Sequence, residues 1–181
     1  DVAEYMDTIH GQGTLGQISS KNPRVAQMAF DTYDRIWEEY TLHNQSNYIR
    51  RLILSSDNPL TYMQMFYSSV PDRTDAASLI ASQDFFIPLY EASSFQWNGL
   101  VQNPFNKISK DYIIPVVRPI YSGESSQTIG WLYVEVSSEL ITNRLKAYPL
   151  ESDSLLYLTI GEKNYLCKNG ELTESPFEFQ W

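Results

Sequence analysis

The sequence is poor in the side chains from which most metal and catalytic sites are built. Its 181 residues include one cysteine, Cys167, and two histidines, His10 and His43. One cysteine excludes an intrachain disulfide, and its apolar–polar strand context indicates a buried structural thiol. The histidines lack the spacing of metal ligands and support no serine triad. We therefore expect no metal, no cofactor and no catalytic constellation.

Long apolar runs are also missing from the sequence. No run is as long as a membrane-spanning helix, and the first residues lack the cationic and apolar regions of a signal peptide. The chain starts at Asp1 without methionine and ends abruptly at Trp181. We interpret it as an excised piece of a longer protein, which leaves flanking membrane helices an open question.

Basic residues are outnumbered: the chain has 13 Lys and Arg but 22 Asp and Glu, which gives a formal net charge of -9. Binding to nucleic acid depends on cations that neutralise phosphates, so the acidity argues against that partner and against an anionic membrane surface. Apolar residues are abundant, with 43% hydrophobic and 14% aromatic. Such a chain can bury a core, and its length suits one domain, or a module and part of another.

The first part of the chain has mainly helical patterns. Residues 1–18 carry apolar side chains at helical spacing, and Asn22 before Pro23 is typical of a helix start. From Val25 to Tyr40 the apolar residues mark one face, which predicts an amphipathic helix. The segment Gly11–Gly16 matches G-x-G-x-x-G, but no buried strand precedes it, so it does not indicate dinucleotide binding.

Strands and helices then alternate up to the middle of the chain. Residues 48–54 are a predicted strand, and after a turn cluster residues 61–67 have the pattern of a half-buried strand or a short helix. Residues 76–92 are predicted to be mainly helical, with Pro88 interrupting or kinking the helix. Residues 93–110 are predicted to be irregular, and they contain several aromatic side chains.

Residues 111–148 have the clearest pattern in the chain: two strands joined by a polar turn, then a helix. In the strand 113–121, Arg118 shares a face with the other even-numbered residues, and two prolines indicate an edge or irregular strand. In the strand 129–136, Trp131, Tyr133 and Glu135 share one face. Residues 149–153 resemble a hinge, and 155–160 and 165–167 are predicted to form a hairpin.

The element order and the segment Gly130–Val136, which follows the strand Ile114–Tyr121, resemble the double Cache domain. This is a PAS-like extracytoplasmic sensor module of bacterial receptors. Residues 18–25 resemble a segment common in one group of Gram-positive sensor histidine kinases. The resemblance implies an α+β fold in which a long N-terminal helix packs on a PAS-like antiparallel β-sheet with flanking helices. It divides the chain into an N-terminal helical region (1–47), a distal sensor module (48–148) and a hairpin that begins a second, membrane-proximal module (149–181).

The resemblance also implies a function. The chain would be the non-catalytic, extracytoplasmic part of a membrane-anchored sensor histidine kinase. It would bind an unknown small molecule in a PAS-like pocket, relay the signal through its N-terminal helix, and could form a homodimer. One subset of the family binds free amino acids through an arginine, a tryptophan and a tyrosine. Here Trp97 is present, whereas Phe95 and Asn98 replace the other two residues. Without the guanidinium a carboxylate loses its bidentate partner, so we do not expect an amino-acid ligand.

Seven residues are candidates to line the pocket, because aromatic faces beside polar groups can hold a small organic ligand. For the aromatic residues the alternative is an ordinary place in the core. For Arg118, which we rank first, the alternative is a salt bridge to Glu135 or Glu91, or an exposed edge position. The candidates are Trp97, Arg118, Tyr121, Trp131, Tyr133, Glu135 and Tyr90.

Two other classes of protein fit parts of the same pattern. A carbohydrate-binding or adhesion module would expose Trp97 and Trp131 on an open, flat face. A glycosidase would need a carboxylate pair, such as Glu91 and Glu135, converging on one cleft. The exposure of these side chains separates the three hypotheses.

Overall fold

The computed structural model describes residues 23–43, 48–56, 62–66, 75–94, 96–106, 111–123, 126–147, 154–168 and 171–175. The helix expected in residues 1–18, the glycine-rich segment 11–16, Phe95 and His10 lie outside the described residues.

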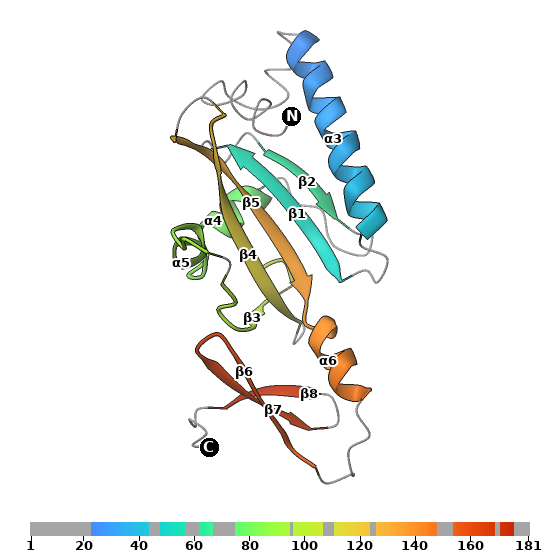
Figure 1. The fold of residues 1–181 in the computed structure, drawn as a ribbon, viewed down its shortest axis with the longest axis vertical. Helices are drawn as coiled ribbons and strands as arrows, with labels where there is room; N and C mark the ends of the chain where they lie inside the picture. Colours follow the sequence, from blue (N-terminus) through green and yellow to red (C-terminus); the bar gives the residue numbers. More distant parts are fainter. Residues whose placement is uncertain are drawn as a thin grey trace.

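The larger sheet is antiparallel and has the strand order β2-β1-β5-β4-β3 (Figure 1). β4 and β5, the two strands with the clearest sequence pattern, pair along almost their whole length. This order, with helices beside the sheet, confirms the predicted α+β class and its PAS-like antiparallel sheet. The strands are β1 (Ile49–Ser56), β2 (Tyr62–Phe66), β3 (Val101–Gln102), β4 (Tyr112–Tyr121) and β5 (Thr128–Ser137).

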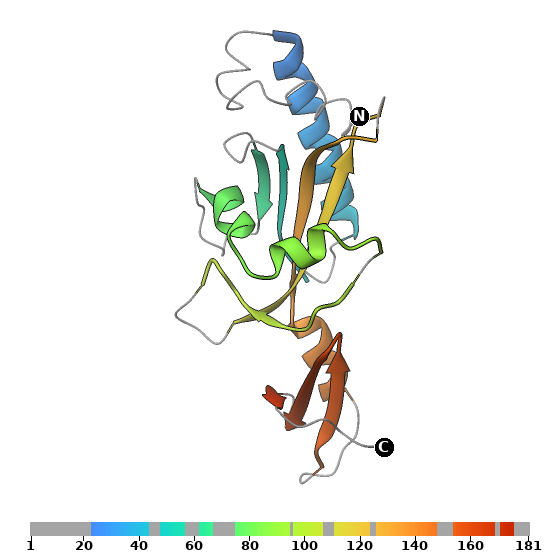
Figure 2. The same cartoon turned by 90° about the vertical axis from the view of Figure 1, so that its left-hand side faces the viewer.

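Helices lie on both sides of this sheet. In Figure 2, α4 (Ala76–Ala81) and α5 (Phe86–Tyr90) are in front of the sheet and α3 (Pro23–His43) is behind it. α3 begins at the predicted proline, and the Tyr40 hydroxyl ties it to β1 by donating to the Ile49 carbonyl at 2.8 Å.

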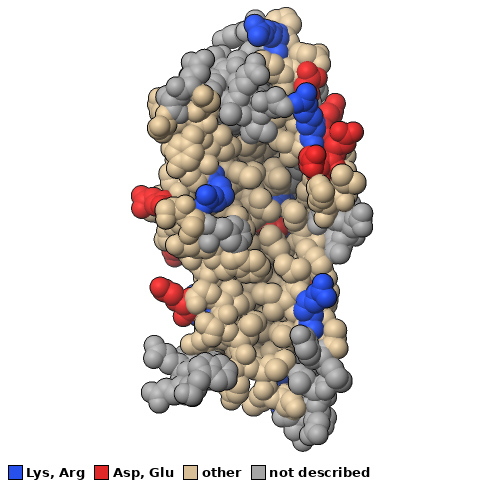
Figure 3. Space-filling view, viewed as in Figure 1, with Lys and Arg blue, Asp and Glu red and all other residues tan. Residues whose placement is uncertain are grey.

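The outer surface of α3 is acidic. Exposed acidic side chains gather along it on the face shown in Figure 3, namely Asp31, Asp34, Glu38 and Glu39. The side chain of His43 lies 3.0 Å from that of Glu39 at the end of this helix. His43 therefore lies on the surface.

Pro88 does not kink a helix, contrary to the prediction. The break between α4 and α5 comes earlier, at residues 82–85, and Pro88 is the third residue of α5. A proline in the first turn removes an N–H that has no partner within the helix. The proline is therefore tolerated inside α5 and does not end it.

The two prolines of β4 lie where a strand can accept them. The Ser138 N–H donates to the Tyr112 carbonyl, and residues of β4 and β5 with the same parity face each other. The even-numbered residues of β4 thus bond to β5, and Pro115 and Pro119 turn their nitrogens toward the opposite edge. β3 pairs only with Tyr112 and Ile113 there, so this part of β4 is an edge, as the prolines predict.

The second sheet is smaller and has the order β6-β7-β8. It follows α6 (Glu139–Lys146) and consists of β6 (Leu156–Ile160), β7 (Lys163–Lys168) and β8 (Glu171–Ser175). The predicted hairpin is confirmed, although its turn is shorter than expected, since β7 already begins at Lys163. Cys167 is buried in β7, as predicted. That residues 48–148 and 149–181 are separate modules stays a prediction.

The two sheets meet at a packed junction. Leu100 and Ile114 from the first part of the chain share a buried cluster with Ile160 and Tyr165. The Leu100 N–H donates to the Tyr165 hydroxyl at 2.6 Å. Gly161, at φ +60°, lies against the segment that follows α5. A Cβ on Gly161 would be 2.0 Å from the Trp97 carbonyl oxygen. The segment after α5 therefore contacts the second sheet directly.

Replacing Tyr165 with phenylalanine tests this junction. Without its acceptor, the buried Leu100 N–H is left unsatisfied, so the free energy of unfolding should fall by about 1–3 kcal/mol in urea denaturation. Tyr121→Phe is the matched control because Tyr121 is 55% exposed, and it should change little. Equal midpoints for the two variants would contradict the role of the Tyr165 hydroxyl.

Candidate functional site

The candidate site lies on the face of β5 that α4 and α5 cover. Trp131, Tyr133 and Glu135 share this face, as predicted, and they are 5%, 0% and 0% exposed. β1 runs beside them, and its register places Arg51 directly opposite Glu135. The alternation of β5 therefore brings an aromatic pair and a carboxylate together with an arginine from another strand.

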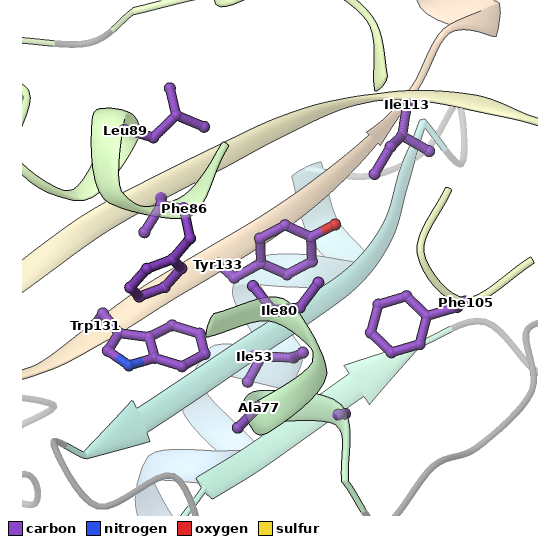
Figure 4. Packing of buried hydrophobic residues seen from close by; sticks show 11 residues of the cluster. Ile53, Ala77, Ile80, Phe86, Leu89, Phe105, Ile113, Trp131 and Tyr133 are labelled. Atoms are coloured by element: carbon purple, nitrogen blue, oxygen red, sulfur yellow. The ribbon is translucent and has the colours of Figure 1, made fainter. Parts of the chain in front are cut away.

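The upper half of the site is apolar. Phe86 of α5 meets Trp131 edge to face, with ring centroids 5.1 Å apart, and Phe85 stacks on Tyr133 at 6.4 Å. Figure 4 shows Tyr133 between the Phe86–Trp131 pair and Phe105. Tyr90 is half-buried beside this core and stacks on Phe86 at 5.5 Å. The helices α4 and α5 thus form an apolar cover over the sheet.

The lower half of the site is a buried ion pair. Arg51 Nε lies 3.8 Å from Glu135 Oε2, and both side chains are fully buried. Arg51 also donates from a guanidinium nitrogen to Gln64 Oε1 at 2.8 Å, and its guanidinium lies 3.8 Å from the centre of the Phe105 ring. A buried guanidinium needs such compensation, because transfer from water is costly for a charge.

Asn103 links the ion pair to the edge of the sheet. Its Nδ2 donates to Glu135 Oε1 at 3.0 Å and to Asp111 Oδ2 at 2.9 Å. Its Oδ1 accepts the Phe105 N–H at 2.9 Å, which fixes the turn after β3. Asp111 in turn accepts from Arg50 at 2.6 Å. One carboxylate oxygen of Glu135 is therefore held in a network that begins at the protein surface.

Two buried oxygen atoms of the site have no hydrogen bond in this network, although Glu135 Oε2 is ion-paired with Arg51 Nε. Among the described residues, neither Glu135 Oε2 nor the Tyr133 hydroxyl has a hydrogen-bond partner. An unsatisfied buried polar group costs about 1–3 kcal/mol, and native proteins satisfy almost all of them. Since the two atoms come from alternate residues of one strand face, one bound molecule could contact both.

Burial sets the electrostatics of these two groups. It raises the pKa of Glu135 from 4.5 to about 7, and the nearby Arg51 guanidinium opposes the rise. Burial also raises the pKa of the Tyr133 hydroxyl well above its ordinary value, and the charge of Glu135 adds to this effect. Near neutral pH the site therefore offers a phenol and a carboxyl group close to its own titration point.

The structure does not bring the other candidates to this cluster. Arg118 pairs with Leu132, so it lies on the opposite face from Glu135. It donates to the Ala92 carbonyl at 3.4 Å. The alternative of a salt bridge between Arg118 and Glu135 does not hold, because Arg51 is the cation beside Glu135. Tyr121 is 55% exposed and Trp97 37% exposed, both away from the buried cluster.

Sequence reasoning missed Arg51 and Asn103. Arg51 alternates with Ile53 and Ser55 in an apolar strand, which places a charged side chain on a buried face. That alternation was the available signal. Asn103 lies in an irregular segment, where only the Asn–Pro sequence indicates a turn.

The rival hypotheses can be compared with these exposures. Trp131 is buried and Trp97 is partly exposed, so they do not share an open aromatic face. Glu135 is fully buried whereas Glu91 is exposed at the end of α5, an arrangement unlike a carboxylate pair in one cleft.

Within the described ranges, no group of three or more His, Cys, Asp or Glu is placed to hold a metal ion. No helix in the described part of the chain is long and apolar enough to span a membrane.

Comparisons with known proteins give distant likenesses. No protein-family model and no curated protein matches the sequence. Among solved structures, the ligand-binding domain of the Campylobacter jejuni chemoreceptor Tlp3 with L-norvaline matches at a TM-score of 0.47 and 13% identity, over 91% of this chain and 72% of that one. The same domain with 4-methylisoleucine matches at 0.44 and 14%, over 70% and 62%. This chain thus spans about three fifths to seven tenths of that domain's length, and at such scores the ligands of the domain are not transferred.

Proposed function

We propose that this chain is the ligand-sensing part of an extracytoplasmic receptor domain, and that a small polar molecule binds between the sheet and the helices α4 and α5. One observation carries the proposal. The buried Glu135 Oε2 and Tyr133 hydroxyl lack hydrogen-bond partners among the described residues, and Tyr133 belongs to the apolar cluster that α4 and α5 share with the sheet. A molecule with hydroxyl or amino donors would satisfy both atoms.

The finer parts of the proposal rest on the sequence. The pattern of residues 111–148 resembles double Cache domains, and residues 18–25 resemble a segment of sensor histidine kinases, so we assign the parent protein to the membrane-anchored sensor histidine kinases. The chain itself is non-catalytic in this proposal, and it pairs with a second copy in the parent receptor. Signalling requires a ligand with different affinity for two arrangements of the domain. The contact between the segment after α5 and the second sheet offers a route by which a shift of α5 would reach the membrane-proximal side.

A thermal-shift screen of amino acids, organic acids, sugars and short peptides tests the proposal. A compound present at a hundred times its Kd stabilises the folded chain by about 2.7 kcal/mol, so its Tm should rise clearly. Tyr133→Phe and Glu135→Gln should each abolish most of that rise, because each removes or neutralises a group that the ligand contacts. Tyr121→Phe is the control and should respond like the parent chain.

Two outcomes would contradict the proposal. One is a screen in which every compound that raises the Tm of the parent chain raises that of Tyr133→Phe and Glu135→Gln equally. The other is a screen in which no compound raises the Tm of the parent chain.

A further inference from the structure

A second hollow lies outside the buried cluster, where the two sheets meet. It has a volume of about 640 Å³ and is lined by Pro88, Gln96, Trp97, Asn98, Gly161, Glu162 and Lys163. Figure 1 shows the turn between β6 and β7 reaching the segment that follows α5. The two walls of the hollow therefore come from segments far apart in the sequence. The hollow exists only because the two sheets pack against each other at the junction.

The hollow has one aromatic surface surrounded by polar groups. The indole of Trp97 is 37% exposed, although tryptophan is usually well buried. The amides of Gln96 and Asn98 flank it in sequence, and both line the same hollow. An indole presents a flat apolar face, and each amide offers two donors and an acceptor.

Charge in the hollow disfavours an anionic occupant. Lys163 lies 3.4 Å from both carboxylate oxygens of Glu174, so its charge is compensated. Its stem packs over Gly99, where an added Cβ would be 2.7 Å from Lys163 Cδ. The remaining charged group of the described lining is the exposed carboxylate of Glu162. A phosphate or carboxylate ligand would need a guanidinium or free ammonium, which the described lining lacks.

We propose that this hollow is a binding site for a neutral polyhydroxylated solute of mono- or disaccharide size. The apolar face of such a ring stacks on the Trp97 indole, while its hydroxyl groups bond to the two amides and to Glu162. The volume lies in the usual range for small-molecule sites, about 300–1,000 Å³. A solute bound there touches the segment after α5 and the β6–β7 turn together, so its occupancy stabilises the junction.

Amide NMR of the intact 181-residue chain, titrated with maltose, cellobiose and lactose, tests the proposal. At least one disaccharide should shift the backbone amides of Asn98, Gly161 and Lys163 and the indole N–H of Trp97. Trp97→Ala should weaken that binding by about tenfold or more, since aromatic contacts and their buried area contribute over 1 kcal/mol. Gln96→Ala, which changes an exposed side chain, should weaken it less.

Trp37→Ala is the matched control, because Trp37 of α3 is 40% exposed and lies outside the hollow. It should bind the disaccharide as the parent chain does. The proposal is overturned if none of the three sugars shifts these amides. It is also overturned if Trp97→Ala and Gln96→Ala both bind like Trp37→Ala, or if the shifts gather around Tyr133 and Glu135 instead.

Discussion

Replacing Arg51 with methionine is expected to lower the free energy of unfolding by about 3–5 kcal/mol at pH 8, the usual cost of breaking a buried ion pair. The change leaves Glu135 fully buried without its cation and removes the donor to Gln64. Urea denaturation measures the loss. Arg118→Met is the control, because Arg118 is partly exposed and makes a 3.4 Å bond to a carbonyl.

A double variant separates the charge from the packing. Replacing Arg51 and Glu135 together with methionine should recover most of the stability, because a buried pair can often be exchanged for apolar residues of similar volume. Two results would contradict the assignment of the pair. Arg51→Met could cost no more than Arg118→Met, or the double variant could be less stable than Arg51→Met.

Stability should also depend on pH through Glu135. Its pKa is raised on folding, so the folded state binds the proton more tightly than the unfolded chain does, and stability falls as pH rises between the two values. The rise from 4.5 to about 7 corresponds to roughly 3 kcal/mol at about 1.4 kcal/mol per pH unit. Against Glu135→Gln, the parent chain should therefore lose stability between about pH 4.5 and pH 7.

Denaturation curves of both proteins across this range give the comparison. The charged groups around Glu135 are Arg51, Arg50 and Asp111, and both proteins contain all three. Their own titration therefore largely cancels in the difference between the two proteins. Parallel stability profiles would show that Glu135 titrates normally. If the parent chain instead gained stability relative to Glu135→Gln as pH rises, the effect of Arg51 on the pKa would outweigh that of burial.

The face of a strand can be predicted from its sequence more safely than the partner of that face. Alternation along β5 is sufficient to group Trp131, Tyr133 and Glu135, because their side chains must point the same way. Which strand pairs beside β5 depends on contacts between residues about eighty positions apart in the chain, and the register of that pairing is set by the whole sheet. This is why the partner of Glu135 is Arg51 of β1 and not Arg118 of β4.

The error over Arg118 has a definite geometric cause. Its alternation was assigned correctly, with the even-numbered residues of β4 on one face. Since even-numbered residues of β4 face even-numbered residues of β5, Arg118 shares its face with Leu132 and not with Trp131. Asn103 was beyond prediction for a different reason, because an irregular segment has no periodicity from which a direction can be derived.

The position of the break in the predicted helix 76–92 shows a similar limit. Pro88 identifies a segment that cannot be a long uninterrupted helix, but a proline is also accepted in a first turn. The sequence thus indicates two short helices without fixing where they separate. In the structure this separation allows Phe86 to contact Trp131 and to cover the site.

The structure of the chain in complex with a ligand whose effect on Tm is lost in Tyr133→Phe and Glu135→Gln tests the central claim most directly. The account predicts that donor or acceptor atoms of the ligand lie about 3 Å from Glu135 Oε2 and from the Tyr133 hydroxyl oxygen, beneath α4 and α5. The contradicting result is a structure in which water or protein groups satisfy both of these atoms while the ligand lies elsewhere.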